Sequence, residues 1–338
     1  MVTPYQKISK KSLVARFIME LNTTIVSEFL YSSTSFLALP FEKSFSPEAY
    51  TAFAHNNYPI CVSILIVYYL FFTYGKKYMD NGTIFSVATN TSGAINAAST
   101  ATTSVNDITN APPVVKAKGI APFDLKYQLA IWNAFLCLFS FLGMCRTVPY
   151  LVANILENDY VQTVCSSPVA NPRPWGKGPC GFWVMLFIFS KVPELIDTVF
   201  LVLRKKPVIF LHWYHHMTVL LFCWNAYASQ AGSGLYFVAM NYSVHALMYG
   251  YYCLQALDSC PKSFPTILIT ISQITQMVIG TGVVISCWYF KLNNVTCHND
   301  ESNLVVGGII YASYLYLFVE FFVKRYGPGN KKRDKKID

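Results

Sequence analysis

Residues 208–224 read Val-Ile-Phe-Leu-His-Trp-Tyr-His-His-Met-Thr-Val-Leu-Leu-Phe-Cys-Trp, an apolar run long enough to cross a bilayer. This run contains three histidines, His212, His215 and His216. At a spacing of i, i+3 and i+4 their imidazole rings fall on one face of a helix. Because polar side chains at membrane depth face a protein interior or a water-filled cavity, we expect the three rings to line a polar cavity in which chemistry takes place.

The composition of the whole chain agrees with a membrane location. Of the 338 residues, 54% are hydrophobic and only 13% are charged, and the mean hydropathy is +0.36. An ordinary soluble domain carries about twice that charged fraction. A transmembrane helix needs roughly 20 mostly apolar residues. The sequence therefore predicts an all-α membrane protein with seven transmembrane helices, at residues 58–74, 129–151, 182–203, 208–224, 235–257, 266–290 and 304–323.

The net charge of +9 is unevenly distributed along the chain. Basic residues follow the first, third, fifth and seventh predicted spans, whereas the loops 152–181, 225–234 and 291–303 carry few of them. Since lysine and arginine collect in cytosolic loops, this asymmetry predicts a lumenal N-terminus and a cytosolic C-terminus. The residues that decide the orientation are Lys76, Lys77, Arg204, Lys205, Lys206, Lys262, Lys324 and Arg325.

Three segments differ in composition from the rest of the membrane domain, which we place at residues 56–326. Residues 1–55 mix basic and apolar residues, and we expect a lumenal segment with an interfacial helix. Residues 81–118 are rich in Thr, Ser, Ala and Asn, which predicts a disordered cytosolic loop. The basic tail 327–338 ends in Lys335-Lys336-Ile337-Asp338. This ending is similar to a di-lysine signal for return to the endoplasmic reticulum, and the alternative is a tail that binds lipid headgroups.

Cysteines and glycosylation sequons lie in the predicted lumenal loops. Cys165, Cys180 and Cys297 occupy these loops, where an oxidising compartment permits a disulfide. No Cys-x-x-Cys motif occurs, so the sequence gives little support for zinc. Asn22 and Asn294 begin Asn-x-Thr triplets and are candidate glycosylation sites.

The third predicted span contains charged residues on one helical face. Lys191, Glu194 and Asp197 follow at a spacing of i, i+3 and i+6. Each charge at membrane depth costs from about 2.5 kcal/mol upward, which requires partners in a polar interior. Pro193 is expected to kink this helix. The alternative is an ordinary helix end near the cytosol, where Lys191 and Glu194 merely pair.

The fifth and sixth predicted spans add further polar side chains at helical spacing. Asn241, His245 and Tyr249 share a face of the fifth span, and Gln273 and Gln276 share a face of the sixth. A single buried histidine is more often a hydrogen-bonded core residue than a catalyst. The histidine cluster on the preceding span makes a catalytic role more plausible. Glutamines can hold helices together, or they can orient imidazoles and a bound thioester.

Polar stripes on four successive spans predict one cavity that opens to the cytosol. The basic turn Arg204-Lys205-Lys206 lies beside it and could anchor a phosphate-bearing substrate. A di-iron oxygenase also uses a His-x-x-His-His motif, but that class draws on more histidines than the six in this chain. A lipid transporter or lipid-binding protein could use the same stripes, although no inverted repeat is visible. Imidazole as base or nucleophile is therefore favoured.

The motifs together resemble those of a known family. In order along the chain they are Lys191-x-x-Glu194-x-x-Asp197-Thr198, His212-x-x-His215-His216, Asn241-x-x-x-His245-x-x-Met248-Tyr249 and Thr270-x-x-Gln273-x-x-Gln276. This set, within residues 125–326, resembles the ELO family of very-long-chain fatty acid elongases. It is most similar to the elongase 6 type, which extends saturated and monounsaturated chains of about palmitate length.

The resemblance implies a very-long-chain 3-oxoacyl-CoA synthase, an acyltransferase that condenses acyl-CoA with malonyl-CoA and releases carbon dioxide and coenzyme A. It implies six helices in an inverted barrel around an acyl tunnel, with no bound metal or other cofactor. It also implies an endoplasmic reticulum location beside ketoacyl-CoA reductase, dehydratase and enoyl-CoA reductase. A homo-oligomer is possible under this resemblance, and no nucleic acid partner is expected.

The resemblance also implies roles for individual residues. His215 would take the acyl group as an acyl-imidazole, and His245 would promote decarboxylation of malonyl-CoA. Cys165 and Cys297 would form a lumenal disulfide. The residues that would hold the imidazoles and the thioester are His212, His216, Lys191, Glu194, Asp197, Asn241, Gln273 and Gln276. Apart from the resemblance, we expect Arg204, Lys205, Lys206 and Tyr249 to contact coenzyme A.

Overall fold

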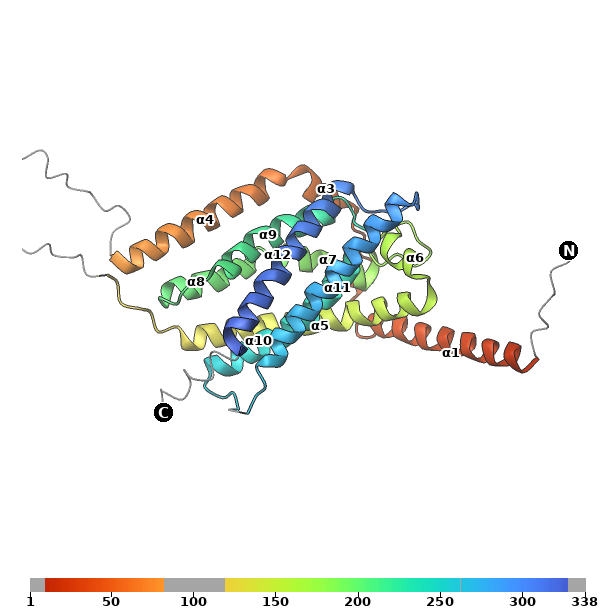
Figure 1. The fold of residues 1–338 in the computed structure, drawn as a ribbon, viewed down its shortest axis with the longest axis horizontal. Coiled ribbons are helices and arrows are strands. Elements are labelled where there is room, and N and C mark those ends of the chain that lie inside the picture. Colours follow the sequence, from red (N-terminus) through yellow and green to blue (C-terminus); the bar gives the residue numbers. More distant parts are fainter. Residues whose placement is uncertain (1–9, 82–118, 262, 328–338) are drawn as a thin grey trace, which may run out of the picture.

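The computed structural model of the chain describes residues 10–81, 119–261 and 263–327. Within these ranges the regular structure is entirely helical (Figure 1). The predicted disordered loop, apart from its first residue, and the basic tail from residue 328 lie outside the described residues. In chain order the elements are α1 (Lys10–Ser35), α2 (Pro40–Lys43), α3 (Glu48–Asn56), α4 (Tyr58–Asn81), α5 (Lys126–Glu157), α6 (Tyr160–Cys165), α7 (Gly178–Ser190), the 3₁₀ turn η2 (Pro193–Leu195), α8 (Ile196–Leu203), α9 (Phe210–Ala228), α10 (Gly234–Ala256), α11 (Ile267–Leu292) and α12 (Glu301–Tyr326).

The all-helical membrane fold expected from the sequence is confirmed. Four helices, α4, α5, α11 and α12, are long and apolar enough to cross a bilayer. Helices α9 and α10 fall on predicted spans but are not among these four, because the histidines and other polar groups that they carry lower their hydropathy. Helices also run further than predicted: α4 continues through the basic residues at 76–77 to Asn81. The number of membrane crossings stays a prediction.

The third predicted span is interrupted in its middle. Helix α7 ends at Ser190, and η2 and α8 follow after Lys191 and Val192. Pro193 is the first residue of the 3₁₀ turn. A backbone N–H at this position would have no intrahelical partner, so its absence in proline costs no hydrogen bond. The backbone N–H of Leu195 donates to Val192 at 3.1 Å, a bond typical of 3₁₀ geometry. The α-helix is therefore interrupted at Pro193, which divides the span between α7 and α8, whereas a kink of the helix axis stays a prediction.

Helix pairing builds a bundle around a polar interior. Helix α10 packs most extensively against α5, and α11 packs against α12, while α4 lies along α8 and α9 (Figure 1). The buried Tyr242 of α10 donates a hydrogen bond to the carbonyl of Trp183 in α7 at 2.8 Å. A buried hydroxyl needs such a partner, so this contact fixes α10 relative to α7.

Helix α1 packs against α5 with its C-terminal half, and its N-terminal half extends beyond the bundle (Figure 1). The Ser27 hydroxyl donates to the Glu157 carboxylate at 2.6 Å. After α1, the Arg146 guanidinium donates to Glu42 at 3.2 Å and to the Phe36 carbonyl at 2.7 Å. These contacts attach the described part of the predicted N-terminal segment to the membrane domain.

The bundle has two chemically different ends. At one end, which we call the disulfide end, Cys165, the last residue of α6, is bonded to Cys297, which precedes α12. The loop between α9 and α10 lies at the disulfide end as well, because the N–H of Gly232 donates a hydrogen bond to the His298 carbonyl at 2.6 Å. At the opposite end, which we call the basic end, α4 and α8 finish and α5 and α9 begin (Figure 1).

Candidate active site

The three histidines of α9 lie together and border one large cavity. The ring centroids of His212 and His216 are 4.5 Å apart, and those of His215 and His216 are 5.6 Å apart. All three side chains line a cavity of about 700 Å³. The shared face follows from the helical spacing of the three positions.

His215 presents its ring to this cavity. The ring packs against that of Tyr314 at a centroid distance of 5.0 Å, and the Tyr314 hydroxyl donates to the His215 carbonyl at 3.3 Å. That hydroxyl also lies 2.6 Å from the Thr218 hydroxyl. No residue in the described ranges forms a hydrogen bond with a ring nitrogen of His215. A neutral imidazole has one lone pair, so this nitrogen is available to a molecule in the cavity.

Lys191 and Glu194 form an ion pair behind the cavity wall. Lys191 Nζ lies 2.8 and 3.0 Å from the two carboxylate oxygens of Glu194. Lys191 is only 2% exposed and Glu194 only 3%. Ser190 donates a further hydrogen bond to the carboxylate at 3.0 Å, and Phe187 places its ring 4.1 Å from the ammonium. This pair does not line the cavity, so its role is to position other groups.

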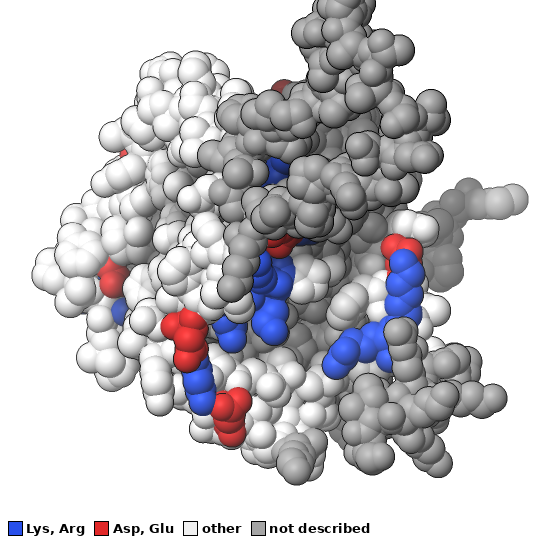
Figure 2. All heavy atoms as spheres, turned by 90° about the vertical axis from the view of Figure 1, so that its left-hand side faces the viewer, with Lys and Arg blue, Asp and Glu red and all other residues white. Residues whose placement is uncertain are grey.

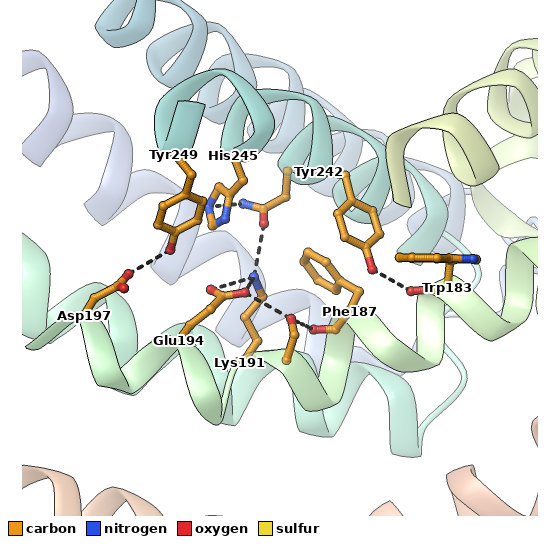
Figure 3. Close-up of polar contacts among 10 residues, drawn as sticks. Trp183, Phe187, Lys191, Glu194, Asp197, Tyr242, His245 and Tyr249 are labelled. Carbon is orange, nitrogen blue, oxygen red and sulfur yellow. Dashed lines mark hydrogen bonds and ion pairs between the residues drawn. The ribbon is translucent and has the colours of Figure 1, made fainter. Parts of the chain in front are cut away.

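Asn241 connects this ion pair to His245. Figure 3 shows Lys191, Glu194 and His245. The Asn241 Oδ1 accepts a hydrogen bond from Lys191 Nζ at 3.2 Å, and its Nδ2 therefore faces the His245 Nε2 at 3.2 Å. Because an amide nitrogen only donates, the Nε2 accepts and the ring proton of neutral His245 is on Nδ1. The ion pair orients the amide, and the amide selects the imidazole tautomer.

Asp197 accepts hydrogen bonds from two aromatic side chains. The indole of Trp132 in α5 donates to Oδ1 at 2.6 Å. The hydroxyl of Tyr249 in α10 donates to Oδ2 at 2.8 Å, as Figure 3 shows. Asp197 and Tyr249 both line the cavity. The Tyr249 hydroxyl is thus occupied by the carboxylate, which makes it a positioning group in this arrangement.

Thr198 orients His212 through its hydroxyl. Its Oγ1 lies 2.8 Å from the His212 Nε2 and 2.8 Å from the hydroxyl of Tyr68 in α4. Thr198 is fully buried and Tyr68 nearly so. A hydroxyl can accept one hydrogen bond while it donates another, so the three groups form a continuous chain that fixes the plane of the imidazole.

The cavity draws its lining from α5, α8, α9, α10, α11 and α12. The predicted glutamines of α11 both contribute. Gln273 donates to the sulfur of Met248 at 3.4 Å, and Gln276 is buried beside the histidines that share the cavity. Their amide groups are candidate donors for a thioester oxygen.

Charged residues surround the cavity mouth at the basic end. Arg204 lines the cavity, whereas Lys205 and Lys206 do not. Lys205 has a left-handed φ of 54°, which turns the chain after α8. Lys126 also lines the mouth and forms an ion pair with Asp258, which joins α5 to the end of α10. Figure 2 looks onto this end and shows several Lys and Arg side chains on it.

The remaining predicted residues lie away from this cavity. The Cys165–Cys297 disulfide is at the disulfide end, and Cys180 is a buried free thiol. Cys287 lies beside the disulfide. In the described ranges, the sulfurs of Cys287, Cys165 and Cys297 form the one group of side chains that lie close enough together to hold a metal ion. Asn22 and Asn294, the sequon residues, are both exposed.

Several side chains of the site carry no sequence signal of their own. Trp132, Tyr68 and Tyr314 lie within apolar runs, where an aromatic residue usually fills space. Their polar atoms nevertheless contact Asp197, Thr198 and the His215 carbonyl. Each of these side chains has an indole or hydroxyl group that needs a hydrogen-bond partner when it is buried. The sequence does not indicate which residue that partner is.

The fold and the site together define a helical membrane protein with a buried, histidine-lined cavity that is open at one end. The sequence profile of the ELO family, also described as the GNS1/SUR4 family, matches residues 53–336. The chain belongs to this family, as its motifs predict.

Three proteins to which the chain is similar in sequence all bear the name of a fatty acid elongase. The chain is 42% identical over 216 residues to "Very long chain fatty acid elongase 6" of Drosophila melanogaster, a match of 62% of this chain and 66% of that protein. It is 41% identical over 218 residues to the Homo sapiens protein of the same name, covering 64% of this chain and 79% of that one. It is 34% identical over 306 residues to "Putative fatty acid elongase 3" of Caenorhabditis elegans, covering 88% and 82%. The similarity to the elongase 6 type, expected from the motifs, is confirmed.

Proposed function

We propose that this chain is the condensing enzyme of fatty acid elongation, which converts an acyl-CoA and malonyl-CoA into a 3-ketoacyl-CoA, carbon dioxide and coenzyme A. The family and the elongases to which the chain is similar support this activity. The observation that carries the mechanism is the ring of His215, which borders the cavity with no hydrogen bond from a described residue to its nitrogens.

In the first step the lone pair of the His215 ring attacks the carbonyl carbon of the acyl thioester. A carbon–nitrogen bond forms, the carbon–sulfur bond breaks, and coenzyme A leaves as a thiol with the ring proton. The product is an acyl-imidazole, a reactive intermediate typical of nucleophilic catalysis. Much of the cavity lining is apolar and includes Leu211, Met277 and Phe318. The acyl chain packs against this apolar lining and excludes water, which protects the intermediate from hydrolysis.

In the second step malonyl-CoA loses carbon dioxide, and the electrons of the broken carbon–carbon bond form a thioester enolate. The enolate carbon attacks the acyl carbon, the carbon–nitrogen bond breaks, and the imidazole of His215 leaves and takes up a proton from solvent, which replaces the one that left with coenzyme A. The Nδ1–H of His245, whose tautomer is set by Asn241, is the donor that we assign to the enolate oxygen. Gln273 and Gln276 supply further donors to the same cavity.

Coenzyme A is placed at the basic end in this proposal. Arg204 borders the cavity mouth, and Lys205 and Lys206 follow it in the turn. Guanidinium and ammonium groups bind phosphates through charge-assisted hydrogen bonds. This placement makes the basic end cytosolic and the disulfide end lumenal in the endoplasmic reticulum. The six cavity-lining helices would then form the inverted barrel, with α4 outside it.

The decisive test is His215→Ala in purified full-length protein. Wild type is expected to convert palmitoyl-CoA and radiolabelled malonyl-CoA into a 3-keto product and, with palmitoyl-CoA alone, to gain one acyl group in intact-protein mass spectrometry. The variant is expected to lose both signals to background because no other group replaces the nucleophile. His55→Ala is the matched control, since His55 is an exposed residue of α3. Full condensation by a folded His215→Ala protein would remove the nucleophile assignment.

A further inference from the structure

Three sulfur atoms lie close together at the disulfide end of the bundle. Cys165 and Cys297 are joined in the disulfide, and Cys287 of α11 is a free thiol. The three sulfurs lie within 4.8 Å of one another. Helix α6, which ends at Cys165, packs against α11, and this packing holds the third sulfur beside the bond (Figure 1). Because sulfur binds a metal as a thiolate, the bonded pair favours sulfur exchange over metal binding.

The three sulfurs differ in their access to solvent. Cys287 is fully buried and Cys165 is 4% exposed, whereas Cys297 is partly exposed in the segment before α12. A reagent in solvent therefore does not reach the Cys287 thiol directly, since the reactivity of a cysteine requires access. The reactive group that lies within reach of this thiol is the neighbouring disulfide.

A buried amide donates hydrogen bonds to this sulfur group. Asn299 is 4% exposed, and its Oδ1 accepts from the backbone N–H of Ser233 at 3.2 Å and from the Ser233 hydroxyl at 2.9 Å. Its Nδ2 lies 3.0 Å from the Val164 carbonyl oxygen, 3.3 Å from the Cys297 sulfur and 3.6 Å from the Cys287 sulfur. An amide nitrogen carries two hydrogens, so one is left for the two sulfurs once the carbonyl is satisfied. That hydrogen stabilises either sulfur when it becomes a thiolate.

We propose that the three cysteines form a thiol–disulfide exchange site, in which Cys287 replaces Cys297 as the partner of Cys165. The Cys287 sulfur gives up its proton and attacks the Cys165 sulfur. A bond between Cys287 and Cys165 forms, the bond between Cys165 and Cys297 breaks, and Cys297 leaves as a thiolate that takes up the proton. The numbers of disulfides and of thiols do not change, so the step needs no oxidant and no reductant.

The exchange releases a reactive thiol while α6 stays cross-linked. In the exchanged form the bond joins α6 to α11, and the partly exposed Cys297 is free to react with thiol reagents and with other disulfides. The N–H of His298 donates to the Cys165 carbonyl at 2.7 Å, and this bond involves no sulfur. The segment before α12 therefore keeps a contact with α6. The exchange does not depend on the proposed condensation.

The test traps the exchanged form in folded wild-type protein. Purified full-length protein is incubated in detergent with N-ethylmaleimide, unfolded with excess iodoacetamide and no reductant, digested and mapped by mass spectrometry. Wild type is expected to accumulate molecules in which Cys297 carries the maleimide and Cys165 is bonded to Cys287. Because uncatalysed disulfide rearrangement takes minutes to hours, the trapped fraction should rise on that timescale.

Cys287→Ser is the deciding variant, because it removes the attacking sulfur and should keep Cys297 unlabelled and bonded to Cys165. Cys180→Ser is the matched control. Cys180 is also a buried free thiol but lies outside the sulfur group, so this variant should behave as wild type. Labelling of Cys260, a partly exposed thiol, shows that the reagent is active.

Two results of the trapping experiment would overturn the exchange site. In the first, Cys260 is fully labelled while Cys297 of wild type stays unlabelled well beyond the hours that rearrangement takes. In the second, Cys297 is labelled equally in wild type and in Cys287→Ser, which would mean that the bond opens without the third sulfur.

Cys297→Ser gives a second, independent measurement. It leaves Cys165 and Cys287 as the two sulfurs of the group, and a disulfide donor of the oxidising compartment should join them. The folded variant should keep a melting temperature that falls on reduction, and Cys297→Ser/Cys287→Ser should lose this dependence. Free thiols at both Cys165 and Cys287 in folded Cys297→Ser would contradict the exchange site.

Discussion

Lys191→Met tests how the buried ion pair supports both stability and catalysis. Methionine has a similar length but removes the ammonium, which leaves Glu194 buried at 3% exposure with Ser190 as its only hydrogen-bond donor among the residues that the structure describes. Removal of one partner from a buried ion pair costs about 3–5 kcal/mol. We expect the free energy of unfolding to fall by this amount. The exposed pair Lys324–Glu320 is the matched control, and Lys324→Met should cost less than about 1 kcal/mol.

The double variant Lys191→Met/Glu194→Leu separates stability from activity. Replacement of both charges by apolar side chains removes the unpaired carboxylate, so most of the lost stability should return. Activity should not return. Without the ammonium, the Asn241 amide loses the bond of 3.2 Å that orients it toward His245. Misplacement of a catalytic group by about 1 Å lowers rates by about 100-fold, and we expect a loss of that order in both variants.

Thermal unfolding in detergent measures the stability of each purified variant, and condensation of palmitoyl-CoA with radiolabelled malonyl-CoA measures its activity. A Lys191→Met protein as stable as wild type would refute the expected cost of burying the Glu194 carboxylate without its ion-pair partner. Wild-type activity in the double variant would show that the His245 tautomer does not depend on the ion pair.

Three other variants test separate features. Replacement of both Cys165 and Cys297 by serine opens a bond across 132 residues of sequence and should lower the free energy of unfolding by about 2–5 kcal/mol, and equal melting of wild type with and without reductant would contradict this. Tyr249→Phe removes one donor to Asp197 and should cost about 1 kcal/mol together with part of the activity; a variant unchanged in both would exclude the positioning role. Asp300→Ala removes the cap of α12, in which the Asp300 carboxylate accepts from the Ser302 hydroxyl and from the Asn303 N–H at 3.2 Å, and should cost about 1 kcal/mol at neutral pH. Because the Ser302 hydrogen bond holds the Asp300 pKa below its ordinary value, the stabilisation is lost as pH falls through that lowered pKa, and the difference from wild type in unfolding experiments should shrink in acid.

Helical spacing explains what could be predicted of the site. His212, His215 and His216 share a face because of the geometry of one helix, which requires no knowledge of the fold. The same rule places Asn241 and His245 four residues apart on α10, in hydrogen-bond contact. The interruption near Pro193 also follows from local chemistry.

Contacts between helices explain what could not be predicted. Asp197 receives its donors from Trp132 of α5 and from α10, and such a choice depends on how three helices pack. The hydrogen bond from the Tyr249 hydroxyl to this carboxylate is likewise a contact between helices that the sequence does not indicate, and the contact of Tyr249 with coenzyme A stays a prediction. The sequence Arg204-Lys205-Lys206 does not indicate which of the three side chains reaches the cavity. In the structure the chain turns at Lys205, which has a left-handed φ, and Arg204 lies at the cavity mouth.

The covalent link between Cys165 and Cys297 has a consequence for the order of biosynthesis. The two sulfurs are 132 residues apart, so the ribosome must complete α7 to α11 before the second thiol exists. Under the proposed lumenal placement of the disulfide end, oxidation can form this cross-link only in a nascent chain in which all of these helices have been synthesised. A chain truncated before residue 297 would lack this cross-link between α6 and the segment before α12.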